Sequence, residues 1–237
     1  MKAQSSLRFI PLLLSPLAVV AGAVLFPAKS HAWISLCVAV LACLPFFLRF
    51  EHRQVTAAEL TCIAILTALT VAGRFLFAAI PAFKPVTALV ILTGMYFGGE
   101  DGFLVGALGA LVSNFYFGQG MWTPFQMLAW GVCGLLAGLL ARSLKTHRLL
   151  LIPAGIVAGG LYSAIMDIWS VLFFGEGFSL TRYGAMILAS LPSTVTYMVS
   201  NVVFLLILAQ PLGRVLTRTR LRHGLDDPAA EKSSATT

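Results

Sequence analysis

Charged side chains are scarce in this sequence. Asp, Glu, Lys and Arg together make up 11% of its 237 residues, whereas hydrophobic residues make up 59%. Soluble domains carry about 25% charged residues, so this chain lacks the polar surface that a water-exposed globule needs. The composition excludes a soluble enzyme, a disordered chain and a soluble nucleic-acid-binding protein. It predicts a polytopic membrane protein.

Sequence motifs for catalysis and metal binding are missing as well. The chain contains no G-x-x-x-x-G-K-[ST] phosphate loop, no H-E-x-x-H and no C-x-x-C. Its four histidines stand at predicted helix ends or in the tail, and its four cysteines stand singly inside apolar runs. We therefore predict no catalytic residue, no metal site and no cofactor, so that the protein is not an enzyme. Binding and transport remain as functions.

Apolar runs divide the chain into three parts. Two runs of spanning length, at about 9–27 and 32–50, precede a charged break at Glu51-His52-Arg53. Six more follow, at about 56–79, 86–98, 102–117, 124–141, 149–173 and 184–210. We predict an all-α fold with an N-terminal extension of two transmembrane helices (1–54), a six-helix core (55–212) and a basic, disordered cytoplasmic tail (213–237). The short runs 86–98 and 102–117 predict a tight helical hairpin or a tilted pair of helices whose ends lie in protein.

The distribution of basic residues predicts the orientation in the cell membrane. With both termini in the cytoplasm, only four of the 16 Lys and Arg residues lie outside, namely Lys29, Arg74, Lys84 and Arg182. Residues 1–32 also resemble a signal peptide that ends at Ser30-His31-Ala32. We favour retention, because the first run is longer than the roughly 7–15 apolar residues of a signal peptide.

Aromatic, amide and charged residues gather in three segments that face outward in this topology, at 74–85, 113–126 and 167–183. An apolar cup with a few convergent polar groups is typical of a small-molecule site, and ionisable residues inside spans are site candidates by default. The predicted substrate-binding residues are Arg74, Lys84, Asn114, Gln119, Trp122, Gln126, Asp167 and Trp169.

Several of these residues have a purely structural alternative. The two tryptophans, Trp122 and Trp169, are also typical of interfacial belt aromatics. Asp167 could pair with Arg74 or Arg182 as a structural bridge, and Lys84 could serve only as an interfacial anchor.

A stripe of small residues marks the first core helix. Ala64, Ala68 and Ala72 recur at four-residue spacing, which allows close approach of another helix. The stripe is either internal packing or a docking surface for a partner protein.

Three stretches carry a resemblance to a known family: Arg74-Phe75 with Phe83-Lys84-Pro85, the run Phe97-Gly98 to Gly106, and Ser113-Asn114 through Gly118-Gln119-Gly120-Met121-Trp122-Thr123-Pro124-Phe125-Gln126. Over residues 55–212 the chain resembles the substrate-binding S components of energy-coupling factor (ECF) vitamin transporters. Among them it is most similar to the cobalamin-type branch.

The resemblance implies a six-helix subunit that captures a vitamin, cobalamin first, in a pocket open to the outside and capped by the loop after the first core helix. It implies as partners a transmembrane coupling protein, which meets the alanine stripe, and two cytoplasmic ATPases. In that family the subunit topples in the membrane to release its load. The alternative is a stand-alone channel or ion-coupled secondary transporter for a small solute, which requires polar residues at mid-membrane positions. Only Asp167 and Glu59 meet that requirement.

Overall fold

The computed structural model describes residues 56–174 and 178–222, and within these ranges it is entirely helical. The two spans predicted before residue 55, the signal-peptide alternative and residues 223–237 lie outside the described part. The six core helices that the sequence predicts are confirmed as α4 (Ala57–Leu76), α5 (Val86–Phe97), α6 (Gly99–Phe117), α7 (Thr123–Leu139), α9 (Leu151–Phe174) and α10 (Leu180–Arg222). A short helix, α8 (Ala141–Thr146), and a 3-10 turn at Arg148–Leu150 connect α7 to α9.

Three segments of the described chain are long and apolar enough to cross a membrane: α4, Arg148–Phe174 and α10. The shorter α5 departs from the rule that a span needs about 20 residues. Every residue of α5 from Val86 to Met95 is buried, with neighbours on α4, α6, α7 and α10. A helix enclosed by other helices does not have to match the bilayer thickness. Its length therefore follows from the protein around it.

The predicted hairpin of α5 and α6 is confirmed. A single residue, Gly98, separates the two helices, and its φ of 106° lies in the region that favours glycine. The first orphan donors of α6 need partners, and the N–H of Gly102 donates to the carbonyl of Gly98 at 3.0 Å. The reversal brings the end of α5 and the start of α6 to the same end of the bundle.

Glycines set the separation of α5, α6 and α7. A Cβ atom at Gly102 would lie 2.7 Å from both the carbonyl oxygen of Gly134 and the Cα of Gly94. At Gly106 it would lie 2.6 Å from the backbone carbon of Trp130. Helices inside a membrane gain stability from such close backbone contact, because burial of apolar surface against lipid gains little. These glycines therefore allow the backbones of α5, α6 and α7 to lie in direct contact inside the bundle.

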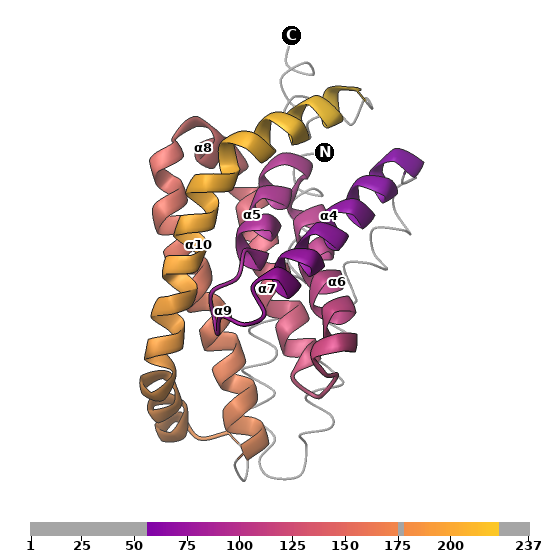
Figure 1. Cartoon of the computed structure of the whole chain (residues 1–237). Helices are drawn as coiled ribbons and strands as arrows, with labels where there is room; N and C mark the ends of the chain where they lie inside the picture. The colour runs from indigo at the N-terminus through magenta and orange to yellow at the C-terminus, as the bar shows by residue number, and fades with distance from the viewer. Residues whose placement is uncertain (1–55, 175–177, 223–237) are drawn as a thin grey trace, which may run out of the picture.

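The last helix is longer than the sequence predicts. α10 continues through Pro211 to Arg222, and its C-terminal part turns across the end of the bundle (Figure 1). Leu216 is buried in this segment, and Arg220 donates a hydrogen bond to the carbonyl of Tyr96 at 3.1 Å. These contacts order residues 213–222, which the basic composition had assigned to the disordered tail. A proline inside a helix removes one backbone donor and favours a bend, which fits the turn.

The glycine contacts predict a clear stability difference. Gly102→Ala should lower the melting temperature in detergent, because the new methyl group meets backbone atoms that cannot move independently. Gly184→Ala is the matched control, since nothing lies within 4 Å of a Cβ there. It should leave the melting temperature unchanged or raise it, because alanine favours helix over glycine by about 1 kcal/mol. Equal melting temperatures for the two variants would contradict the proposed role of Gly102.

Candidate vitamin-binding site

A chain of side-chain hydrogen bonds joins four helices where α4 and α6 end and α7 begins. Arg74, in the last turn of α4, donates to the hydroxyl of Ser113 and to Oδ1 of Asn114, the latter at 2.7 Å. Asn114 Nδ2 donates to Gln126 Oε1 at 2.9 Å, and Gln126 Nε2 donates to the Tyr162 hydroxyl at 2.9 Å. Three predicted residues, Arg74, Asn114 and Gln126, thus lie in one connected network.

The network is buried. Asn114 is fully shielded from solvent, and Gln126 and Tyr162 are each only 5% exposed. Buried amides are stable only when they are hydrogen-bonded, and each amide here finds its partner in another side chain of the network. The position of every polar atom therefore depends on its neighbours on other helices.

Aromatic rings enclose the guanidinium group of Arg74. Its Cζ atom lies 4.6 Å from the centroid of Phe117 and 5.3 Å from that of Trp130. Trp130 stacks on Tyr162 with centroids 5.3 Å apart, and Tyr162 contacts the ring of Tyr197 at 5.0 Å. The site thus combines one cation, two amides and a group of stacked rings.

The end of the loop between α4 and α5 lies beside this region. Lys84 is fixed to α10 through its backbone: its N–H donates to the Ser200 hydroxyl at 2.9 Å, and that hydroxyl donates to the Lys84 carbonyl at 3.0 Å. The Lys84 Nζ atom lies 5.9 Å from the centroid of Phe117, the same ring that Arg74 covers. Partial burial lowers the pKa of the Lys84 ammonium group, and the nearby charge of Arg74 lowers it further.

A second aromatic cluster contains the two predicted tryptophans. The rings of Trp122 and Trp169 meet edge to face at 5.8 Å, and Trp169 stacks on Phe173 at 5.4 Å. The indole Nε1 of Trp169 is buried and has no hydrogen-bond partner among residues 56–174 and 178–222. A buried donor without an acceptor is costly, so this N–H is a candidate to donate to a ligand.

The remaining two predicted residues have local roles. Gln119 closes the turn between α6 and α7, because its Nε2 donates to the Leu111 carbonyl and its Oε1 accepts from Thr123, both at 2.9 Å. Asp167 accepts a hydrogen bond from Ser190 at 2.7 Å, which joins α9 to α10. Gln119 is connected to the network through Thr123, whose hydroxyl accepts from Asn114 Nδ2 at 3.0 Å and donates to Gln119.

Sequence reasoning missed Trp130 and Tyr162. Both lie well inside apolar runs, where a large aromatic residue is usually core. One signal was available for Trp130, which follows Gln126 by four residues and therefore shares its helix face. Tyr162 had no comparable signal.

The arrangement is suited to binding and offers little for bond chemistry. Its groups are a cation, amides, hydroxyls and rings, and in the described part of the chain no group of three or more His, Cys, Asp or Glu could hold a metal ion. Planar π-systems stack on the rings, and carbonyl or N–H edges exchange hydrogen bonds with amides. The fold is that of a helical membrane protein, and the groups of the candidate site suit binding of a small organic molecule.

Comparison with known proteins identifies the family. The family model for the ECF-type riboflavin transporter S component matches residues 54–218 of the chain. The chain therefore belongs to this family and is a substrate-specific subunit of an ECF transporter, a transporter component and not an enzyme. The match confirms the resemblance to S components, but it does not support the cobalamin-type branch. Comparisons with curated proteins and with solved structures give no significant match.

The network predicts that Tyr162→Phe destabilises the protein although it deletes a single oxygen atom. Gln126 Nε2 then loses its acceptor in a buried site, which costs about 1–3 kcal/mol of unfolding free energy. The matched control is Tyr116→Phe, because the Tyr116 side chain is 73% exposed. Equilibrium unfolding in detergent measures both variants. The same unfolding free energy in both would show that the Gln126–Tyr162 bond contributes nothing.

Proposed function

We propose that the protein captures a planar aromatic vitamin of the riboflavin type at the outer end of its helical bundle. The observation that carries this proposal is the buried chain from Arg74 through Asn114 and Gln126 to Tyr162, flanked by the stacked rings of Trp130 and Tyr162. The family match supports both the transporter role and the class of substrate.

The chemistry of the site favours a flat heterocycle over cobalamin. An isoalloxazine ring has two faces for stacking and an edge of carbonyl and N–H groups, which match aromatic rings and amide side chains. Cobalamin is a bulky macrocycle, which the four-helix network could admit only by separating α4, α6, α7 and α9. The substrate expected from the sequence is therefore replaced in this proposal by a flavin.

Residues near the network extend the proposed site. The free Nε1 of Trp169 offers a donor, and the Lys84 loop provides a cover fixed by Ser200. Trp122 lies against Trp169 and adds apolar area at the entrance. Gln119 and Asp167 support the site without lining it in this proposal. Gln119 stabilises the turn before α7, and Asp167 joins α9 to α10.

Energy for uptake comes from partner proteins in this proposal. The alanines of the predicted stripe, Ala64, Ala68 and Ala72, are all exposed, while the opposite face of α4 is buried against the bundle. A smooth, exposed helical face allows a second helix to approach closely. We assign this face to the transmembrane coupling protein, which links the subunit to two cytoplasmic ATPases.

Vitamin binding tests the substrate and the site. Riboflavin should saturate the detergent-purified protein with submicromolar affinity in the absence of ATP, as measured by loss of flavin fluorescence. Gln126→Ala or Trp122→Ala should weaken binding at least tenfold, about 1.4 kcal/mol. The matched control for Trp122 is Phe115→Ala, an exposed aromatic residue of the same region, which should bind like the wild type. Tight binding of cobalamin with no response to riboflavin would overturn the substrate assignment, and an unchanged affinity in Gln126→Ala would overturn the site.

The docking face has a separate test. Ala68→Leu should leave riboflavin affinity unchanged but abolish uptake by cells or vesicles that contain the coupling protein and ATPases, because the larger side chain prevents close helix contact. Ala189→Leu is the control, since Ala189 is an exposed alanine on α10. If Ala68→Leu instead reduces binding and uptake in parallel, the face supports the fold and is not the docking surface.

A further inference from the structure

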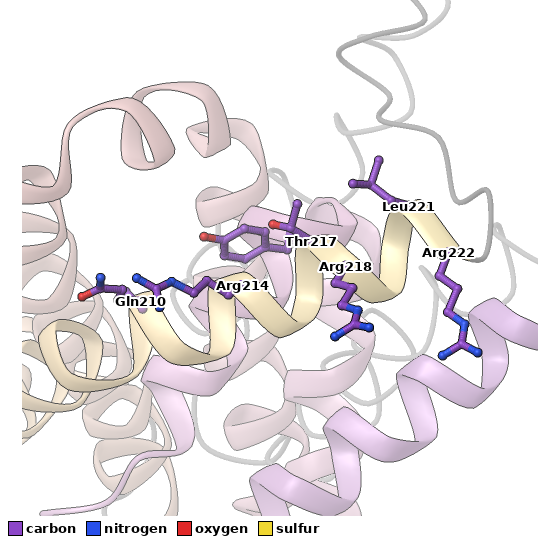
Figure 2. A pocket seen from close by; sticks show the side chains of 9 residues that line it. Gln210, Arg214, Thr217, Arg218, Leu221 and Arg222 are labelled. Carbon is purple, nitrogen blue, oxygen red and sulfur yellow. The ribbon is translucent and has the colours of Figure 1, made fainter.

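A basic groove lies at the opposite end of the bundle from the vitamin site. It has a volume of about 810 Å³ and runs between Tyr96, at the end of α5, and the C-terminal part of α10. The α10 residues that line it include Gln210, Arg214, Thr217, Arg218, Leu221 and Arg222 (Figure 2). No residue in this lining is acidic.

Three arginines give the groove its charge. Arg214, Arg218 and Arg222 follow one another at four-residue spacing, so they share one side of the helix, and all three are exposed. Figure 2 shows Arg218 and Arg222 extending from the same side of α10. Like charges at this spacing destabilise a helix. An anion bound between them would relieve the repulsion.

Neighbouring groups reinforce the positive field. Lys145 Nζ lies 5.2 Å from the centroid of the Tyr96 ring, and Arg148 donates to Gln210 Oε1 at 3.4 Å. Of the carboxylates that begin α4 and α6 at this end, Glu100 is half-buried, whereas Glu59 and Asp101 are each only 4% exposed. The latter two lie inside the bundle, whereas the arginine side chains reach into the solvent-facing groove.

Apolar residues on the same segment indicate a lipid surface. Val215 and Leu221 are 58% and 78% exposed and alternate with the arginines, while Leu216 faces inward. A helix with exposed apolar residues among arginines, turned across the end of a bundle, is typical of the interface between headgroups and acyl chains. Basic pockets beside transmembrane helices on the cytoplasmic side bind anionic headgroups.

We propose that this groove binds the phosphodiester headgroup of an anionic phospholipid of the cytoplasmic leaflet. Arg214 and Arg218 supply charge and N–H donors to the phosphate oxygens, and the hydroxyls of Tyr96 and Thr217 offer further donors. The exposed Val215 and Leu221 contact the acyl chains. This site is independent of the vitamin, and it fixes the end of α10 to the membrane surface.

Lipid binding to the full-length, detergent-purified protein tests the proposal. Native mass spectrometry would count bound phosphatidylglycerol and phosphatidylcholine over a titration of each. Phosphatidylglycerol should bind more tightly, and Arg214→Gln or Arg218→Gln should each weaken its binding about fivefold, the effect of one basic residue near an anionic surface. Arg218→Lys keeps the charge and should lose less.

The matched control is Arg142→Gln, which removes an exposed arginine of α8 outside the groove. It should leave phosphatidylglycerol binding unchanged. An equal loss in Arg142→Gln, equal binding of phosphatidylcholine, or displacement of the lipid by an equal concentration of inorganic phosphate would each overturn the headgroup site. A different result would also overturn the headgroup site: Arg214→Gln and Arg218→Gln bind lipid normally but no longer copurify with the coupling protein and ATPases. The groove would then be a protein-docking surface. Riboflavin titration of the same variants keeps this outcome separate from failure of the vitamin site.

Discussion

A guanidinium group inside a helical membrane bundle has to be solvated by the protein itself, and the organisation of the bundle end that holds Arg74 depends on that requirement. Burying an unpaired cation would be very costly. Arg74 is stabilised by oxygen acceptors of Ser113 and Asn114 and by the faces of Phe117 and Trp130. Once the Asn114 carbonyl accepts from Arg74, its amide nitrogen is free to donate only toward α7, which orients Gln126 and in turn Tyr162. One charge on α4 thus fixes side chains on three other helices.

The precision of this network requires a rigid frame, and the glycine contacts supply it. Gly102 packs against Gly94 and Gly134 with no space for a methyl group, so α5, α6 and α7 have one permitted separation. The enclosed α5 has neighbours on both sides of this contact and is short because protein surrounds it. The loop that is proposed to cover the site is held to α10 by the Ser200 hydroxyl and by contact of the Phe83 ring with that of Phe204.

Hydropathy was sufficient to predict the number and order of the core helices, because six apolar runs between 56 and 210 leave little freedom in how the chain crosses a bilayer. It failed at the end of α10, where Leu216 and Arg220 are ordered by contacts with other helices that a basic composition does not reveal. In the candidate site, the residues at helix ends could be selected from the sequence, since Arg74, Asn114 and Gln126 are polar where polarity is costly. Tyr162 was not predicted, because a tyrosine in an apolar run has the same sequence pattern whether it packs passively or accepts a hydrogen bond. Only the hydrogen bond from Gln126 on α7 distinguishes these two roles of Tyr162, and Gln126 lies 36 residues away in the sequence.

The long helix α10 connects the two ends of the molecule. Tyr197 and Ser200 touch the proposed vitamin site and its cover, whereas the arginines from Arg214 onward line the basic groove, with Pro211 between the two regions. If the groove holds lipid headgroups, the C-terminal part of α10 is tied to the membrane surface while the exposed alanine face of α4 remains available to a partner. Under the proposed function, the subunit draws its energy from that partner and moves relative to it during transport. A proline between the ligand-facing and membrane-facing parts of one helix is then a natural place for the molecule to bend, since the missing backbone donor weakens the helix at that point.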